Sequence, residues 1–221
     1  MGKYGNSREQ PAHGRKYELY VTVGAVAVVL VAAIWLAVST HRPEVAGDSR
    51  ETGSSSGINS QINHLKQEIN DLQSILSSQP ADKESLVTLA NNQYDLGSIY
   101  LFDLQQKEEG TEWFNRAVES YQKVLDLDPE NIAARVDMAT AAFYAGREAL
   151  AKSSFEQAVS QAPTYANARI NYGVFLADAK EDYKGAIAQW ERVLEMNVDQ
   201  DTINHVQSLI KEAEDIMASQ E

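Results

Sequence analysis

The C-terminal half of the chain repeats one pattern of small, aromatic and apolar positions at an interval of 34 to 35 residues. In each copy an alanine is followed four residues later by an aromatic residue, and seven residues later by a small or apolar one. Residues spaced in this way share one face of an α-helix. The three copies are Ala117, Tyr121 and Val124; Ala151, Phe155 and Ala158; and Ala186, Trp190 and Val193. This interval predicts stacked helical units, each of which buries its apolar face against a neighbour.

The middle unit, residues 131–163, predicts a pair of antiparallel helices. Its first half carries small or apolar residues at helical spacing, including Met138 and Ala142, and Gly146 follows that half. Glycine ends a helix readily because it accepts a positive φ. The second half resumes the spacing and stops at Pro163, since proline lacks an amide donor and crowds the preceding turn.

This unit resembles the tetratricopeptide repeat family, although Arg135 stands where the family has a large residue at position 4. Counted from Ile132, the family's small, aromatic and proline positions are Ala139, Ala151, Phe155, Ala158 and Pro163. A further unit counted from Ala166 matches at Tyr172, Gly173, Ala186, Trp190 and Val193, with Val198 in place of the proline. The resemblance implies an all-α fold, a right-handed superhelical array of about three helical hairpins.

We expect this array over residues 82–197, with units at 82–129, 130–163 and 164–197. An apolar stripe after the last unit predicts a capping helix at 200–219, which covers the open face of the array.

The first unit is longer than the others, because the alanine of family position 20 falls fifteen residues late, at Ala117. We interpret the excess as about two extra turns in each helix, at 98–106 and 111–116, around a turn at 107–110. The apolar residues of this taller hairpin either pack inside its tip, which we favour, or form an exposed docking patch. These residues are Ile99, Tyr100, Phe102, Trp113 and Phe114.

Residues 58–79 predict an amphipathic, coiled-coil-like helix whose apolar positions follow a heptad spacing. The stripe consists of Ile58, Ile62, Leu65, Ile69, Leu72 and Leu76. β-Branched residues at one core position and leucine at the other favour parallel two-stranded coils. The run is short for an independent coil, so two alternatives stay open: packing on the repeat array, or a homodimer through residues 58–76.

The N-terminal region predicts a single membrane span. Residues 1–16 are polar and basic, as in a disordered tail, and residues 19–38 contain no charged side chain. Twenty helical residues reach about 30 Å, the thickness of a bilayer's hydrocarbon core. A buried core helix or a cleavable signal peptide is the alternative, but the apolar run is longer than that of a typical signal peptide. We therefore expect an uncleaved transmembrane helix at 17–40 and a flexible linker at 41–57.

Flanking charge predicts the orientation of this span. Four basic residues precede it, and Arg42 and Arg50 are the only ones in the dozen residues after it. The positive-inside bias then places the N-terminus in the cytoplasm and the repeats outside, in a bacterial cell.

Charge and composition narrow the function. The chain has a net charge of −13, and residues 41–221 carry 15 Lys and Arg against 30 Asp and Glu. Such a surface disfavours nucleic acid and anionic lipid headgroups. The chain has no cysteine, its four histidines are scattered, and no nucleotide, hydrolase or metalloprotease motif occurs. We expect no enzymatic activity, no cofactor and no metal site.

The resemblance implies a concave groove, lined by the first helix of each unit, that binds a protein or peptide partner. The family's contact positions correspond to Val87, Asn91, Tyr94, Ala133, Val136, Thr140, Phe143, Asn167, Ile170 and Val174. This lining is apolar with several amides, which suits an extended or helical peptide. Family members that bind chaperone C-termini hold the carboxylate with basic residues, and the matching positions here are Val87, Asn167 and Asn171. Asp137 replaces the asparagine of that clamp, and only Asn91 agrees with it.

The predicted function is a membrane-anchored interaction scaffold or assembly factor. Two alternatives share this architecture: an organelle-surface receptor whose repeats face the cytosol, and an accessory subunit of an envelope or secretion enzyme complex.

Overall fold

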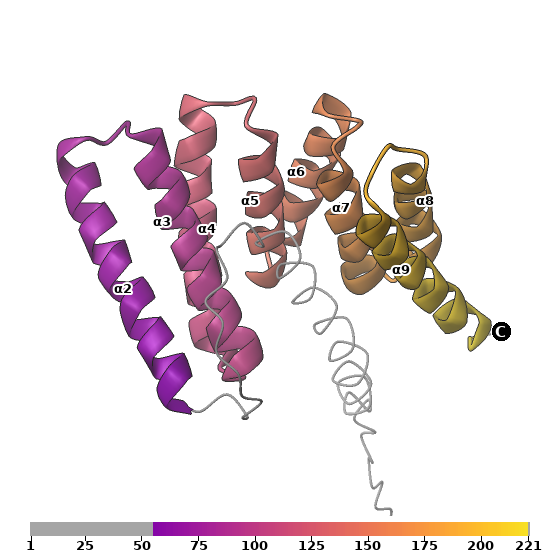
Figure 1. Cartoon of the computed structure of the whole chain (residues 1–221), viewed down its shortest axis with the longest axis horizontal. Helices are drawn as coiled ribbons and strands as arrows, with labels where there is room; N and C mark the ends of the chain where they lie inside the picture. The colour runs from indigo at the N-terminus through magenta and orange to yellow at the C-terminus, as the bar shows by residue number, and fades with distance from the viewer. Residues whose placement is uncertain (1–54, 221) are drawn as a thin grey trace, which may run out of the picture. The chain divides into compact units, whose positions relative to one another are not determined.

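A computed structural model describes residues 55–220, in which every regular element is helical. The elements are α2 (Ser55–Ser78), α3 (Lys83–Ser98), η1 (Ile99–Asp103), α4 (Lys107–Leu127), α5 (Ile132–Tyr144), α6 (Glu148–Gln161), α7 (Ala166–Lys180), α8 (Tyr183–Leu194) and α9 (Gln200–Ala218). Figure 1 shows α2 to α7 arranged in chain order, with α8 and α9 together at the C-terminal end of the series. The expected all-helical repeat array is confirmed.

The helices form three hairpins, α3 with α4, α5 with α6, and α7 with α8. Successive hairpins meet through α4 and α5 and through α6 and α7, while α5 also packs on α7. At the two ends of this series, α2 packs on α3 and α9 packs on α8. The first helices of the hairpins, α3, α5 and α7, are the elements expected to carry the binding residues.

The membrane prediction falls outside the described residues. No helix within residues 55–220 is both long enough and apolar enough to cross a bilayer. The expected tail at 1–16, the span at 17–40 and all but the end of the linker at 41–57 precede that range.

Local sequence determines where the repeat helices begin and end. Asn131 caps α5, since its Oδ1 accepts a hydrogen bond of 3.0 Å from the backbone N–H of Ala134. Asp182 caps α8 in the same way through the N–H of Gly185, at 2.9 Å. Between α5 and α6 the chain turns at Gly146, whose φ is +74°, a conformation that glycine adopts without strain.

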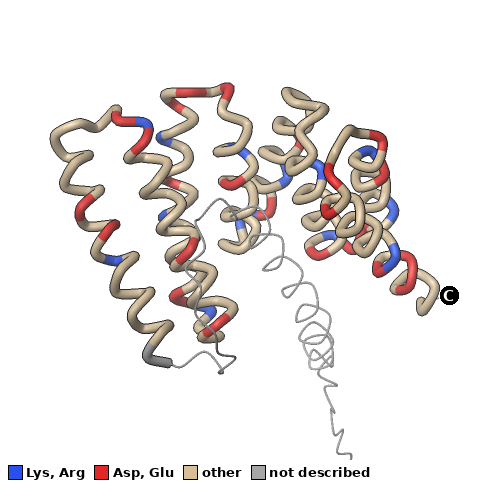
Figure 2. Tube along the Cα trace, viewed as in Figure 1, with Lys and Arg blue, Asp and Glu red and all other residues tan. Residues whose placement is uncertain are grey.

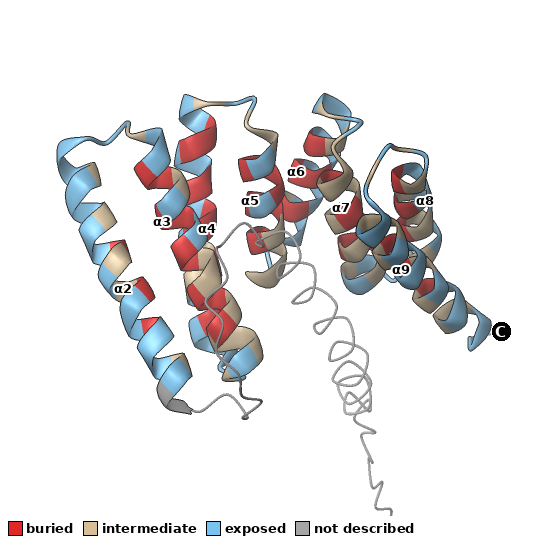
Figure 3. Cartoon of the chain, in the orientation of Figure 1, coloured by how far each residue is buried: buried red, intermediate tan, exposed pale blue. Residues whose placement is uncertain are grey.

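The repeated positions form the core. All of the small, aromatic and apolar residues of the three copies are at most 2% exposed. Buried positions lie on the sides of the helices that face their neighbours (Figure 3). The 34-residue pattern therefore marks where one helix packs on the next.

The first hairpin is taller, as expected, but its turn lies elsewhere. α3 continues into the π-helix η1, and the chain reverses at residues 104–106, where Gln105 has a φ of +55°. Residues 107–110, which we expected to form the turn, are the first turn of α4. Glu108 and Glu109 suit that position, because carboxylates stabilise the positive end of a helix dipole. Gly110 allows close packing there: an added Cβ would lie 2.9 Å from the backbone N of Leu101.

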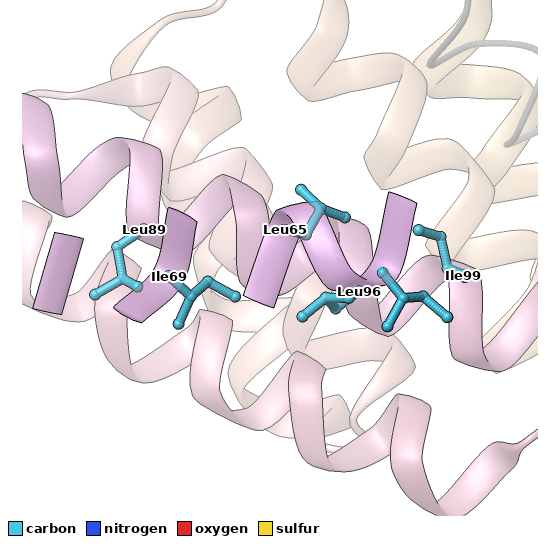
Figure 4. Packing of buried hydrophobic residues seen from close by; sticks show 6 residues of the cluster. Leu65, Ile69, Leu89, Leu96 and Ile99 are labelled. Atoms are coloured by element: carbon cyan, nitrogen blue, oxygen red, sulfur yellow. The ribbon is translucent and has the colours of Figure 1, made fainter. Parts of the chain in front are cut away.

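The heptad stripe of α2 is buried against α3 and η1. Ile62, Leu65 and Ile69 form a cluster with three residues of the tall hairpin, Leu89, Leu96 and Ile99 (Figure 4). The Nζ of Lys66 donates to the Tyr100 hydroxyl at 2.9 Å, beside this cluster. Packing on the array is thus the alternative that the structure shows. A parallel coil through the same stripe would have to displace α3.

The apolar residues of the tall hairpin pack internally, which confirms the favoured interpretation. Phe114 is fully buried, and Ile99 is 5% exposed. Tyr100 and Trp113 are partly buried against the α2 cluster, and the Phe102 ring meets Tyr144 edge-on at 5.1 Å. These side chains hold α2, the tall hairpin and α5 together.

Candidate polypeptide-binding face

The expected contact residues lie on α3, α5 and α7, and we call the side that they define the first-helix face. Asn91 and Ala133 are exposed. The partly buried members are Val87, Tyr94, Thr140, Phe143, Asn167 and Val174. Val136 and Ile170 are only 2% and 4% exposed. These two side chains are buried between helices and support the face from beneath, so little of their surface is open to a ligand.

Hydrogen bonds hold two of the polar residues on this face. The hydroxyl of Tyr121, from α4, donates to the Oδ1 of Asn91 at 2.8 Å. The Thr140 hydroxyl donates to the carbonyl of Val136 in its own helix, at 3.0 Å. The Asn91 carboxamide is therefore oriented by the second helix of its hairpin.

A chain of aromatic rings links the three hairpins beneath and along the face. Tyr94 meets Phe114 edge-on, with ring centroids 5.2 Å apart. Phe114 lies 5.1 Å from Tyr144, Tyr144 lies 5.0 Å from Phe143, and Phe143 meets Phe175 edge-on at 5.6 Å. Offset and edge-on pairs are the favoured aromatic geometries. They make this part of the face rigid and apolar.

Two carboxylates stand on the same helices, Asp137 on α5 and Asp178 on α7. Both residues are exposed to water, yet the protein around them removes enough hydration to raise the pKa of each to about 6. For Asp178 the charge of Glu212, on α9, adds to this effect of burial on the pKa. Neither carboxylate forms an ion pair with any residue between 55 and 220.

Two tyrosines on this face have hydroxyl pKa values that the charges of these carboxylates raise. Burial raises the pKa of Tyr94, and the charges of Asp137 and Asp95 raise it further. Burial likewise raises the pKa of Tyr144, with contributions from Tyr94 and Asp178. Both phenols therefore stay neutral at ordinary pH, within the field of the two aspartates.

The arginines of α5 and α7 are engaged elsewhere. Arg135 donates from Nη2 to the carbonyl of Pro129 at 2.6 Å and from Nη1 to Gln157 at 2.9 Å. Arg169 repeats the arrangement one unit later, through the carbonyl of Pro163 at 3.0 Å and Gln189 at 2.9 Å. Each arginine thus joins the preceding turn to the second helix of its own hairpin.

Sequence reasoning predicted Tyr94 but missed Tyr144 and the two carboxylates as members of this face. Asp137 was considered only as a departure from the chaperone clamp, and Asp178 and Tyr144 were not considered as binding residues. One signal was available, since Asp95 and Asp178 occupy the same family position, the thirteenth, in the first and third units.

The face combines aromatic rings, amides and carboxylates. Within residues 55–220 no group of three or more His, Asp or Glu side chains is arranged to hold a metal ion. Acidic positions occur on every α-helix of the array (Figure 2).

Comparisons with known proteins agree with this class of fold. A tetratricopeptide repeat family model matches residues 110–131. RNA polymerase II-associated protein 3 of Xenopus tropicalis is 32% identical over 100 residues, which are 43% of this chain and 15% of that protein. The chain therefore spans only about 15% of the length of this relative.

The solved structures that this chain matches include MamA and RPAP3. A MamA crystal structure is 16% identical, with a TM-score of 0.48, over 78% of this chain and 98% of that one. The first TPR of Spaghetti (RPAP3), bound to the HSP90 peptide SRMEEVD, is 23% identical, with a TM-score of 0.39, over 56% of this chain and 91% of that one.

The helical hairpins, their 34-residue interval and the family match together support a tetratricopeptide repeat array. Proteins of this class are typically interaction scaffolds without enzymatic activity, and this fold supports the same role.

Proposed function

We propose that the protein is a membrane-tethered scaffold that holds a partner polypeptide on its first-helix face. The observation that carries the proposal is the composition of that face. Half-buried aromatic rings lie on α3 and α5, at Tyr94, Phe143 and Tyr144, and exposed carboxylates lie on α5 and α7, at Asp137 and Asp178. Rigid aromatic side chains next to polar groups are typical of the residues that dominate protein interfaces.

A photoreactive amino acid tests the binding role. It would replace Ala133, which is exposed on the first-helix face, and, as a control, Gln122, which is exposed on α4. We expect Ala133 to crosslink a polypeptide in living cells and Gln122 to yield much less of that product. Equal labelling from both positions, or no polypeptide at Ala133, contradicts the proposal.

The membrane tether in this proposal is inferred from the sequence alone. Residues 19–38 form an uncharged apolar run, and the four basic residues before it favour a cytoplasmic N-terminus. Under this proposal the repeats lie outside the cytoplasm of a bacterial cell. Protease added to intact cells should then digest residues 58–221.

An organelle receptor is the alternative with the opposite topology, since its repeats face the cytosol. Protection of residues 58–221 in intact cells, with digestion after lysis, would favour it. An accessory subunit of an envelope or secretion complex has the same topology as the scaffold. The identity of the crosslinked protein separates those two functions.

A homodimer through residues 58–76 is a further possibility from the sequence, and it competes with the observed packing of α2. Because Ile62, Leu65 and Ile69 are buried in a single chain, dimerisation would require α2 to leave α3. Sedimentation of the full chain in detergent would detect such a dimer.

A further inference from the structure

We infer that the partner presents Lys or Arg side chains to the first-helix face, within a segment that also carries apolar residues. This inference rests on the proposed function, because it specifies which kind of polypeptide the same face selects.

The first-helix face carries unpaired negative charge within the described part of the chain. Asp137 and Asp178 have no ion-pair partner among residues 55–220. The arginines nearest to them in sequence, Arg135 and Arg169, are bonded to the preceding turns and to glutamines of the second helices. The face therefore carries negative charge that these guanidinium groups do not neutralise. A cation from a partner would supply the missing pairing.

The surroundings of those two carboxylates strengthen their attraction for a cation. Both residues are exposed, yet desolvation by the surrounding protein raises the pKa of each carboxyl, so each has lost part of its hydration. Charge pairs gain strength where water is scarce. A basic side chain would thus gain more here than at a fully hydrated surface carboxylate.

Aromatic rings on the same face also favour lysine or arginine. Tyr94, Phe143 and Tyr144 are only partly buried, so their rings add apolar surface to the face. The charge of Asp137 acts on the Tyr94 hydroxyl and that of Asp178 on the Tyr144 hydroxyl. Lysine and arginine suit such a place, because their methylene stems pack on apolar surface and their cationic ends are attracted to aromatic faces. Apolar neighbours in the same partner segment would cover the remaining ring surface.

An acidic peptide fits poorly. The RPAP3 structure holds a peptide with the sequence SRMEEVD, which ends in three acidic residues among its last four. In this chain the clamp positions are occupied by Val87, Asn167 and Asn171, which carry no positive charge. Asp137 would repel such a ligand. Like charges brought together at an interface reduce affinity.

Two probe peptides of opposite charge test the inference on the full chain in detergent. One carries lysines around Phe and Leu, and the other has glutamate in place of every lysine. Fluorescence anisotropy at low salt and pH 7.5 should show the lysine peptide binding at least about tenfold more tightly.

Charge-removing variants locate the binding. Asp137→Asn with Asp178→Asn should weaken the lysine peptide by about tenfold or more. The matched control removes the same number of charges from exposed positions of second helices, through Glu119→Gln and Glu191→Gln. It should change the affinity by less than about twofold, since long-range charge acts weakly at exposed sites. If the double variant does not fold, Asp137→Asn and Asp178→Asn are measured separately, after circular dichroism has shown that each is folded.

Two results would overturn the inference: equal binding of the two peptides to the unmodified chain, or equal weakening by both pairs of substitutions. These outcomes leave the proposed function intact if Ala133 still crosslinks a polypeptide in cells. Loss of that crosslink contradicts the proposed function itself.

Discussion

Gly173 and Trp190 are packed so closely that a Cβ added to Gly173 would lie 2.2 Å from the Nε1 of Trp190. The same Nε1 donates to the carbonyl of Ile170 at 3.1 Å, which fixes the indole against α7. In the middle unit Ala139 takes the place of Gly173, and the smaller Phe155 is the matching aromatic residue. Between these two units, the larger ring is matched by the smaller first-helix residue.

Gly173→Ala should destabilise the third hairpin by about 1–3 kcal/mol, because overpacking forces a well-packed core to shift. Gly57→Ala is the matched control: it lies in α2 with no atom within 4 Å of an added Cβ. That change should be neutral or stabilise by up to about 1 kcal/mol, since alanine is the better helix former. Thermal unfolding of both variants measures the difference. Equal effects at the two positions would contradict the packing described for Trp190.

Ile69→Ala tests the attachment of α2 to the array. Ile69 is 3% exposed in the cluster with Leu89 and Leu96, so its truncation should cost about 2–5 kcal/mol. Ile75→Ala, on the same helix at a position 42% exposed, should cost much less.

Repeating the Ile69 measurement over a range of protein concentration distinguishes packing within one chain from dimerisation. Packing on α3 predicts a loss that is independent of concentration. A loss that grows on dilution would instead indicate a coil between two chains.

Arg135→Lys should destabilise the middle unit by about 1–3 kcal/mol, because Arg135 is buried and a lysine cannot reproduce its two bonds to the Pro129 carbonyl and to Gln157. Arg192→Lys is the control. Arg192 pairs with Glu195 on the surface, where ion pairs contribute little. Chemical denaturation should separate the two variants, and similar midpoints would show that the Arg135 bonds do not stabilise the array.

The pKa of Asp137 predicts a pH dependence of stability. Burial raises this pKa from 3.8 to about 6 in the folded protein, so folding disfavours the ionised carboxylate. The destabilisation is absent below the unfolded pKa, near pH 4, and develops as the pH rises through about 6. Tyr94 and Tyr121 face the same group and stay neutral over this window, because burial and Asp137 raise the pKa of both hydroxyls.

Asp137→Asn should therefore raise the melting temperature at pH 7.5 and leave it nearly unchanged at pH 3.5. Because Asp137 is exposed to water, we expect an effect smaller than the full pKa shift implies. Glu119→Gln, which removes an exposed carboxylate from α4, should show no such difference between the two values of pH. A gain for Asp137→Asn that is the same at both would contradict the desolvation of this carboxylate.

The helical repeat could be predicted because it depends on residues that recur at a constant interval. Phe155 and Trp190 are buried where the periodicity places them. The turn of the first hairpin could not be located in this way. It depends on a left-handed residue, Gln105, and on a π-helix, and neither has a distinctive sequence pattern.

The binding face was only partly predictable. Family positions identify which helix carries a residue but not how deeply its side chain lies, so Val136 and Ile170 were assigned to the surface. The family pattern treats Arg135 as a departure, whereas the structure shows a bond to the preceding turn that recurs at Arg169. The pKa of Asp137 is raised by burial in the folded array, which no local motif encodes.

The most direct test of the central claim is a photocrosslinking scan in living cells with one position on each helix of the three hairpins. Asn91, Ala133 and Asn167 sample the first helices, and Gln122, Lys152 and Glu191 sample the second. Our account predicts that one polypeptide is captured from the first-helix positions and is nearly absent from the others. Capture mainly from the second helices, or from neither set, would contradict the claim that the first-helix face holds the partner.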